Sequence, residues 1–455
     1  MDLNAARRLF PLATEAGLRT LERIRQHGSA PKWTHEIGDH VIAGDLAVVA
    51  DFRKAQAATQ PTSRLTPPDE LVARIAALRE KVPLWEERVP KGFDFARDWG
   101  YLPTMTREDI ASRVEQCLPV DEPRDRLIVY ETSGTTGHAV RVPHHPRAVA
   151  LLHVLAETAL GWHGRKVREG SGQVSCMNLR AQASVWVYAS IFSVWREAGF
   201  ARINLNPHAW SGGVEDCRRF VREMDPGFLS GDPGSFSELL KLEVSAKPSA
   251  MLSTAVALTR PLAQSLEARY GCPVLDWYST TETGPIACSR PGGDGLALLA
   301  SDLFVEILDA EGLPVPEGQR GEIVVSGGRN PYLPLLRYRT GDFARMVWGA
   351  DGPRIVDLEG RGSVVFRATD GSPVNPVDVG RALRNNFAVV QHEFVQRADG
   401  ACEATLRPAW GSPIDPDQVA TELRELFGKD ATISVRLDET LGVERKAIPY
   451  RSELT

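Results

Sequence analysis

Short apolar runs alternate with amphipathic stretches along the middle of the chain. The runs have the length of strands and cover residues 127–130, 228–230, 251–254 and 273–278. Helical periodicity occupies the stretches 146–162, 233–243 and 259–270. Because parallel strands need a crossover connection, this alternation predicts a largely parallel sheet with helices on its faces. The run at 127–130 is predicted to be a buried strand.

The pattern changes twice after residue 300. Three strand-like segments follow one another without long helices, which predicts an antiparallel sheet or small barrel: 303–308, 321–326 and 343–348. A compact α+β unit is then predicted, with helices at 376–386 and 415–427 and strands at 391–397, 401–408 and 431–436. We place a domain boundary between these two patterns, at 360–363.

The chain is therefore predicted to be an α/β protein with domains at 1–361 and 362–455. The first domain would hold layered, mostly parallel sheets and the antiparallel, barrel-like part. Its residues 1–125 are predicted to be mainly helical. Two helices in that region, 69–81 and 106–116, have Thr66 and Thr106 as their expected N-caps.

Composition narrows the class of protein. The 455 residues carry 53 basic and 59 acidic side chains, a net charge of −6, which argues against nonspecific binding of nucleic acid. No run of about 18 apolar residues predicts a membrane span, and the N-terminus has no signal-like core. The six cysteines form no C-x-x-C pair, so neither a disulfide framework nor a zinc ribbon is expected. A cytoplasmic location is the default expectation.

A glycine- and hydroxyl-rich loop follows the first predicted strand. It contains Ser133, Gly134, Thr135, Thr136 and Gly137. Glycines let backbone N–H groups converge on an anion, and the hydroxyls add donors, so the loop is a candidate phosphate site. The alternative is an ordinary surface loop. The loop lacks the Gly-Lys-Ser/Thr ending of a Walker A motif.

Four further segments are candidates for ligand binding. In 276–285, Tyr278 offers a flat ring at a strand end, and Glu282 offers a carboxylate for Mg²⁺. In 336–346, Asp342 can accept hydrogen bonds from a ribose diol. Arg361 and Lys446 are cations that could reach phosphate or carboxylate groups. Each residue also has a plain alternative as a turn residue or a solvated charge.

Taken together and in order, these segments resemble the acyl-adenylate-forming, or AMP-binding, superfamily. TSGTTG is similar to its phosphate loop, YSTTE to its Y-G-x-T-E segment, YRTGD to its ribose-binding segment and GR at 360–361 to its hinge. LPTMTREDI, RYRTGD and the ending RKA are most similar to the phenylacetate-CoA ligase-like branch. The resemblance covers residues 83–450 and implies a large domain followed by a mobile lid, 362–455.

The resemblance also implies roles for individual residues. Ser133 to Gly137 would bind the ATP phosphates, Glu282 would bind Mg²⁺, and Thr135 and Lys446 would act in catalysis. Asp342 and Arg361 would hold the ribose. Asp276 and Tyr278 would lie near the adenine, and the loop with Ser253, Thr254 and Ala255 would flank it. Other residues of the ATP/AMP site would be Trp277, Ser279 and Thr281.

The sequence departs from the family pattern at several positions. His138 stands where a lysine usually follows the phosphate loop, and Ser279 replaces the glycine of Y-G-x-T-E. The base-flanking loop, 253–256, reads STAV instead of carrying glycines. Ser363 and Val364 stand at the usual acidic or lysine pivot of the hinge, which bears on thioester formation. Only Cys288 follows the T-E segment, so no zinc is expected.

The acyl pocket is expected on residues 184–195 and on the loop after residue 206. Trp186 and Tyr188 would form an aromatic wall, and His208, Trp210 and Gly212 would add polar contacts for a planar acid. The alternative for the aromatic side chains is simple core packing.

The expected activity is ATP-dependent activation of an aromatic acid as an acyl-AMP, with transfer of the acyl group to CoA. Two alternatives remain: transfer to an amine, a hydroxyl or a carrier-protein thiol, and a nucleotide-binding protein without catalysis. The implied cofactors are ATP, Mg²⁺ and CoA. The expected partners are a small carboxylic acid and the acyl acceptor, with neither nucleic acid nor membrane, and a homodimer is one assembly we consider. The acid, the acceptor and the role of residues 1–60 stay open.

Overall fold

The computed structural model describes most of the chain, and its described parts form two compact units. The described residues are 3–58, 66–131, 140–299, 302–349, 352–360, 364–443, 447 and 449–454. The first unit comprises Met1–Asp39, Arg165–Asp276 and Gly362–Thr455, and the second comprises His40–Gly164 and Trp277–Arg361. No helix in the described part is long and apolar enough to span a bilayer.

The first unit contains a mostly parallel sheet. Its strands are β3 (Val174–Arg180), β4 (Tyr188–Phe192), β5 (Ala198–Asn204), β6 (Phe228–Gly231), β7 (Met251–Ser253) and β8 (Val274–Thr280). They are hydrogen-bonded in the order β8-β7-β6-β3-β5-β4, and β4 alone runs antiparallel to its neighbour. The carboxyl ends of five strands therefore share one edge, where ligands usually dock in such sheets.

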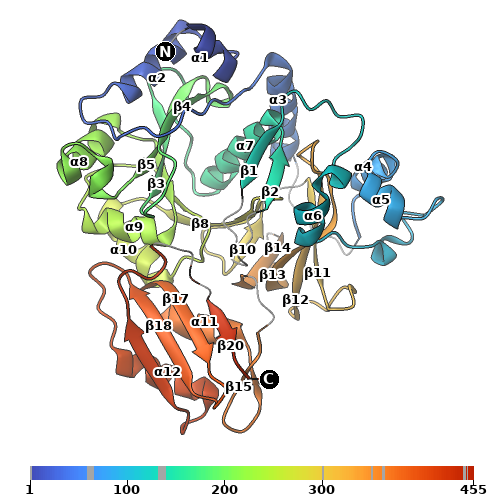
Figure 1. The fold of residues 1–455 in the computed structure, drawn as a ribbon, viewed down its shortest axis with the longest axis vertical. Coiled ribbons are helices and arrows are strands. Elements are labelled where there is room, and N and C mark those ends of the chain that lie inside the picture. The colour runs from blue at the N-terminus through green and yellow to red at the C-terminus, as the bar shows by residue number, and fades with distance from the viewer. Residues whose placement is uncertain are drawn as a thin grey trace. The chain divides into compact units, whose positions relative to one another are not determined.

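Helices of the first unit pack on the apolar face of this sheet (Figure 1). They are α1 (Leu3–Leu9), α2 (Glu15–Arg25), α8 (Gly213–Met224), α9 (Pro233–Lys241) and α10 (Arg260–Tyr270), with the short 3-10 turn η3 (Pro207–Ala209). A second 3-10 turn, η2 (Ser193–Trp195), follows β4. Their local starts follow from sequence. For example, Asp232 caps α9 by accepting a hydrogen bond from the N–H of Ser235 at 2.9 Å, and Pro233 fills the first helical position.

The C-terminal part of the first unit is the compact α+β module that the sequence predicted. It contains β15 (Phe366–Arg367), β16 (Pro373–Val374), α11 (Pro376–Asn386), β17 (Val389–Gln396), β18 (Cys402–Pro408), α12 (Pro416–Phe427), β19 (Ile433–Leu437) and β20 (Tyr450–Ser452). The strands pair in the order β19-β18-β17-β20, shown in orange and red in Figure 1. Phe366, Phe394 and Phe427 pack against one another at its core.

The second unit joins helices to an antiparallel sheet. The helices are α3 (Ala43–Ala58), α4 (Asp69–Leu78), α5 (Pro83–Arg88), η1 (Trp99–Tyr101), α6 (Arg107–Cys117) and α7 (Pro146–Trp162). The strands are β1 (Ile128–Glu131), β2 (Arg141–His144), β9 (Gly284–Ser289), β10 (Leu296–Leu298), β11 (Leu303–Leu308), β12 (Arg320–Gly327), β13 (Leu335–Gly349) and β14 (Gly352–Glu359). The main strands pair in the order β11-β12-β13-β14-β10-β9, and the end of β8 pairs with β9.

The predicted α/β class is confirmed, and two local predictions are wrong. The run at 127–130 is not a buried strand. It forms β1 in a two-stranded hairpin with β2, and Val129 is 45% exposed. The helix predicted from 69 ends at Leu78, and its N-cap is Pro68 instead of Thr66. Thr106 is confirmed as the cap of α6. The two-domain division stays a prediction, and its boundary residues 361–363 lie outside the described residues.

Candidate functional site

Strand β8 and the turn after it carry five of the predicted nucleotide-binding residues. Asp276, Trp277, Tyr278 and Ser279 are consecutive on β8, and Thr281 begins the turn to β9. Trp277 and Tyr278 are buried, whereas the other three are partly exposed. The pairing of β8 with β9 shifts register between Tyr278 and Ser279, so the strand is irregular where the family pattern has glycine.

The predicted ribose-binding Asp342 lies in a bulge of β13. Three residues of that strand, 340–342, lie opposite the single residue Ile323 of β12. Gly341 has a φ of 79°, which a glycine adopts without strain. Asp342 accepts a hydrogen bond of 2.9 Å from the hydroxyl of Tyr278. Bulges commonly redirect a side chain near a site, and this one brings two predicted nucleotide-binding residues together.

Glu282 lies in the turn between β8 and β9 and is only 3% exposed. Its Oε1 accepts a hydrogen bond of 3.1 Å from Nη1 of Arg107, and the two side chains form an ion pair. The hydroxyls of Thr280 and Thr283 lie 3.0 Å apart, and the N–H of Thr283 donates to the Thr280 hydroxyl at 3.1 Å. These bonds close the turn that carries Glu282, so its carboxylate has a defined position.

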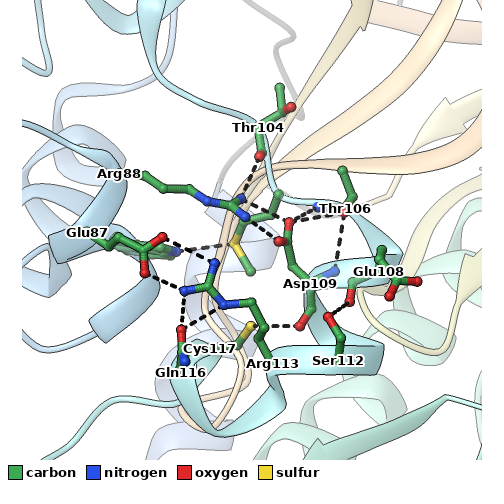
Figure 2. A network of polar contacts seen from close by, with 12 residues as sticks. Glu87, Arg88, Thr104, Thr106, Glu108, Asp109, Ser112, Arg113, Gln116 and Cys117 are labelled. Carbon is green, nitrogen blue, oxygen red and sulfur yellow. Dashed lines mark hydrogen bonds and ion pairs between the residues drawn. The ribbon is translucent and has the colours of Figure 1, made fainter.

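Arg107 is the first residue of α6, and a polar network fixes this helix end (Figure 2). Thr106 and Asp109 form a capping box, in which the Asp109 carboxylate accepts from the N–H of Thr106 at 2.8 Å. Burial alone would raise the pKa of Asp109, but hydrogen bonds from Arg88 and Thr106 hold it below its usual value. The sequence analysis missed Arg107, although it directly follows the correctly predicted cap.

His144, at the end of β2, is a further buried polar residue that the sequence analysis missed. Its ring lies 4.8 Å from that of Tyr130, and only 7% of its surface is exposed. Burial lowers its pKa to about 4, although a hydrogen bond with the backbone of Thr281 opposes this shift. The imidazole is therefore neutral at pH 7. Its Nε2 is buried and has no hydrogen-bond partner among the residues that the structure describes.

In the first unit, the base-flanking loop begins at the end of β7. Ser253 is fully buried, and its hydroxyl has no hydrogen-bond partner within the described ranges. Thr254 donates its N–H to the carbonyl of Gly231 at 2.8 Å. Ala255 has a φ of 71°, in the region that favours glycine, and Ser253 lies directly beside Asp276 of β8. An alanine therefore holds a left-handed backbone conformation in this loop, at some cost in strain.

Two of the predicted acyl-pocket residues, Trp210 and Gly212, have structural roles, and a third, His208, is exposed. Trp210 is 3% exposed, belongs to the apolar core, and donates its indole N–H to the carbonyl of Asn204 at 2.8 Å. Gly212 precedes α8 and donates its N–H to Asp216 at 2.6 Å. His208 is exposed on η3. Trp210 is therefore part of the apolar core.

The other two predicted pocket residues differ from each other. Trp186 is 51% exposed and stacks on His35, with ring centroids 4.5 Å apart. Tyr188 is partly buried on β4 and lies beside Arg202 of β5. Burial raises the pKa of Tyr188, and the charge of Arg202 opposes that rise. Only Tyr188 therefore faces a charged partner on the sheet.

Several predicted residues lie outside the described residues, and their roles stay predictions. They are Ser133, Gly134, Thr135, Thr136, Gly137, His138, Arg361, Ser363 and Lys446.

The fold is that of acyl-CoA ligases of known structure. The chain is similar to a crystal structure of 2-hydroxyisobutyryl-CoA ligase in complex with R3-HIB-AMP, with a TM-score of 0.65 and 15% sequence identity. The similarity covers 92% of this chain and 96% of that one. Residues 45–330, more than half of the chain, match the family of AMP-binding enzymes. The chain belongs to that family.

Curated relatives match over shorter stretches. Protein CapK of Staphylococcus aureus is 21% identical over 316 residues, which cover 65% of this chain and 66% of CapK. The phenylacetate-coenzyme A ligase of Pseudomonas putida is 36% identical over 110 residues, 23% of this chain and 25% of that enzyme. The chain thus matches just under two thirds of the first relative and a quarter of the second.

Proposed function

We propose that this chain is an acid ligase that activates a carboxylic acid with ATP and transfers the acyl group to CoA. The observation that carries the proposal is the hydrogen bond between Tyr278 and Asp342, which joins two nucleotide-binding motifs in an AMP-binding enzyme. The buried, unpartnered hydroxyl of Ser253 supports a polar ligand at the neighbouring edge of the first unit's sheet.

The chemistry requires few protein groups. The substrate carboxylate attacks the α-phosphorus of ATP and pyrophosphate leaves; the CoA thiol then attacks the acyl carbonyl and AMP leaves. A carboxylate is already ionised at neutral pH, so the first step needs no general base. Charge accumulates on phosphate oxygens, and we assign the loop 133–137 and Lys446 to its stabilisation. Asp342 would bind the ribose and Tyr278 the adenine.

Glu282 suits a magnesium site that is completed by phosphate oxygens. Mg²⁺ in nucleotide sites usually takes one or two protein carboxylates and several oxygens from phosphate and water. The described residues contain no group of three His, Cys, Asp or Glu side chains arranged for a metal, which fits a site with one carboxylate. When bound, Mg²⁺ would neutralise charge on the leaving pyrophosphate. Arg107 pairs with the same carboxylate and would have to yield to the ion.

We propose an aromatic acid as the substrate class. The phenylacetate-coenzyme A ligase of Pseudomonas putida supports this assignment, because it is 36% identical over its matched region. Tyr188, which lies on β4 beside Arg202, is the predicted pocket residue that would contact the ring of the acid.

The test is ATP–pyrophosphate exchange with Mg²⁺ across a panel of aromatic and short aliphatic acids. Exchange with one acid, followed by CoA-dependent AMP release, is the expected result. Exchange without any effect of CoA would direct the search to amines, alcohols and carrier proteins as acceptors. Lys446→Ala should lower exchange by about 10²-fold or more, because one charged transition-state contact is lost. Lys429→Ala, at an exposed position of the same module, is the matched control.

A further inference from the structure

The parallel sheet of the first unit has one apolar face and a second face that carries both aromatic side chains, such as Phe192 and Phe200, and polar ones. On the apolar face lie core residues of β3 and β5, namely Met177, Leu179, Ala201 and Ile203. On the opposite face, cross-strand pairing places four polar side chains in one row across β4, β5, β3 and β6, namely Tyr188, Arg202, Asn178 and Ser230. Parallel strands that are buried on both faces are normally apolar throughout, so this row requires another explanation.

Asn178 and Ser230 of this row, together with the adjacent Arg180 and Asp232, hydrogen-bond with protein groups. Arg180 donates to Oδ2 of Asp232 at 3.0 Å, and Gln182 and the hydroxyl of Ser235 donate to the same oxygen at 3.0 and 2.9 Å. Burial alone would raise the pKa of Asp232, but these partners hold it below its usual value. Asn178 donates to Ser230 at 2.8 Å and accepts from Arg180 at 3.1 Å. The carboxylate of Asp232 is therefore ionised and already committed to these donors.

Arg202 lacks a carboxylate partner of this kind, although its side chain is hydrogen-bonded to that of Tyr188. It is partly buried, and no carboxylate of the described chain lies within ion-pair distance of its guanidinium. Its Nε is buried without a hydrogen-bond partner in the same described residues. Burial lowers its pKa and the positive charge of Arg180 adds to that effect, whereas Tyr188 and the negative charge of Asp232 oppose it. Buried charges are normally paired, so this position lacks an anion.

The position of Arg202 along the sheet edge suits a group on the acid substrate. In the strand order, β3 is two strands and β5 three strands from β7, which ends at the base-flanking loop. With about 4.8 Å between neighbouring strands, Arg180 and Arg202 lie about 10 and 14 Å along the edge from that loop. A nucleotide with its base at that loop, together with a small acid joined to its α-phosphate, would cover this distance.

We propose that Arg202, supported by Arg180, binds a second carboxylate on the acid, so that the substrate is a dicarboxylic acid. This inference rests on the proposed function, because it assigns the anion to the acid that is adenylated. A guanidinium offers two parallel N–H donors to a carboxylate, and the neighbouring hydroxyl of Tyr188 can add a third. The rest of the row, Asn178 and Ser230, would face the middle of the acid.

The test compares matched pairs of acids that differ by one carboxylate: butanedioate and butanoate, hexanedioate and hexanoate, and benzene-1,4-dicarboxylate and benzoate. ATP–pyrophosphate exchange gives kcat/KM for each acid with the wild-type chain, Arg202→Met, Arg202→Lys and Arg219→Met. The wild type should prefer the diacid in at least one pair. Arg202→Met should reduce that preference about 30-fold, the size expected for a lost charged hydrogen bond, and Arg202→Lys should lie between. Arg219 is exposed on α8, so Arg219→Met should leave the preference unchanged.

Two further measurements separate a structural role of Arg202 from a role in binding, and binding from catalysis. Thermal unfolding without ligand should show the same or a higher midpoint for Arg202→Met, since an uncompensated charge is removed; a clear fall would indicate a structural role. Calorimetric titration of the preferred diacid without ATP measures binding apart from catalysis. Binding that Arg202→Met abolishes, with no exchange for any acid, would retain the carboxylate site and overturn the ligase proposal. Preference for the monoacid in every pair, or equal loss for both acids, would overturn the inference and leave the ligase proposal standing.

Discussion

The two units of the chain differ in how they accommodate arginines that are removed from solvent. In the second unit, Arg337 pairs with Glu306 at 3.3 Å, Arg329 pairs with Asp302 at 3.0 Å, and Arg107 pairs with Glu282. In the first unit, Arg180 pairs with Asp232. The neighbouring Arg202 has no carboxylate within ion-pair distance among the described residues. Arginine is therefore held in ion pairs in the second unit, whereas Arg202 in the first unit forms no ion pair with a carboxylate of the described residues.

This difference separates two kinds of evidence. A buried ion pair whose donors are all hydrogen-bonded gives no indication of a ligand, because both charges are compensated within the fold. A partly buried charge without a partner lowers stability, and it persists only where something else compensates it. Glu282 and Arg107 fall between these cases: they are paired with each other, yet both lie in segments that resemble the family's motifs.

Breaking the structural pair should give the largest effect on stability. Arg337 is 1% exposed and also donates to the carbonyls of Gly100, Leu102 and Gly312. Arg337→Met would leave Glu306 and these carbonyls buried without their donor, so we expect a loss of about 3–5 kcal/mol in the free energy of unfolding. Urea denaturation followed by tryptophan fluorescence measures it.

The contrast with Arg202→Met is the internal control for this prediction. Arg202→Met should cost nothing or stabilise slightly, since no carboxylate is left behind. Equal losses for both variants would remove the distinction between the two units. Burial raises the pKa of Glu306, so part of the loss in Arg337→Met should be relieved at lower pH, where that carboxyl takes up a proton more readily.

The role of the Glu282–Arg107 pair can be tested by measuring how pyrophosphate exchange depends on Mg²⁺ concentration. Glu282→Gln removes the charge that we assign to the metal and should lower pyrophosphate exchange by about 10²-fold. Arg107→Met removes the competing cation, so the Mg²⁺ concentration for half-maximal exchange should fall several-fold. If the pair is purely structural, Arg107→Met will lower the unfolding midpoint while the Mg²⁺ dependence stays the same as in the wild type.

The sequence predicted the helices and strands better than it predicted which side chains contact one another. Helix α7 and the helices of the C-terminal module lie at their predicted positions, because amphipathic periodicity states which face is buried. Periodicity does not distinguish a central strand of a buried sheet from a strand of an exposed hairpin. The run at 127–130 was placed wrongly for that reason. The capping box at Thr106 is a local signal of four residues and was read correctly.

The site shows the same limit. Tyr278 and Asp342 were identified from motifs, but their hydrogen bond depends on a bulge that no pattern in the sequence predicts. Arg202 and Tyr188 are neighbours only through strand pairing between β4 and β5. The sequence did carry one usable signal, because an arginine at an inner position of a predicted strand is costly unless it is paired.

The smallest effect predicted here concerns His144, whose buried imidazole belongs to the same turn region as Glu282 through its contact with Thr281. Burial lowers its pKa from 6.5 in the unfolded chain to about 4 in the folded chain. Between these values the unfolded state binds the proton and the folded state does not, so stability falls as pH falls from about 6.5 to about 4 and changes no further below that. At pH 5 the contribution should be about 1–2 kcal/mol. His144→Asn should therefore show a flatter decline of the unfolding free energy between pH 7 and pH 5 than the wild type. Parallel declines for His144→Asn and the wild type would show that this imidazole does not titrate on unfolding.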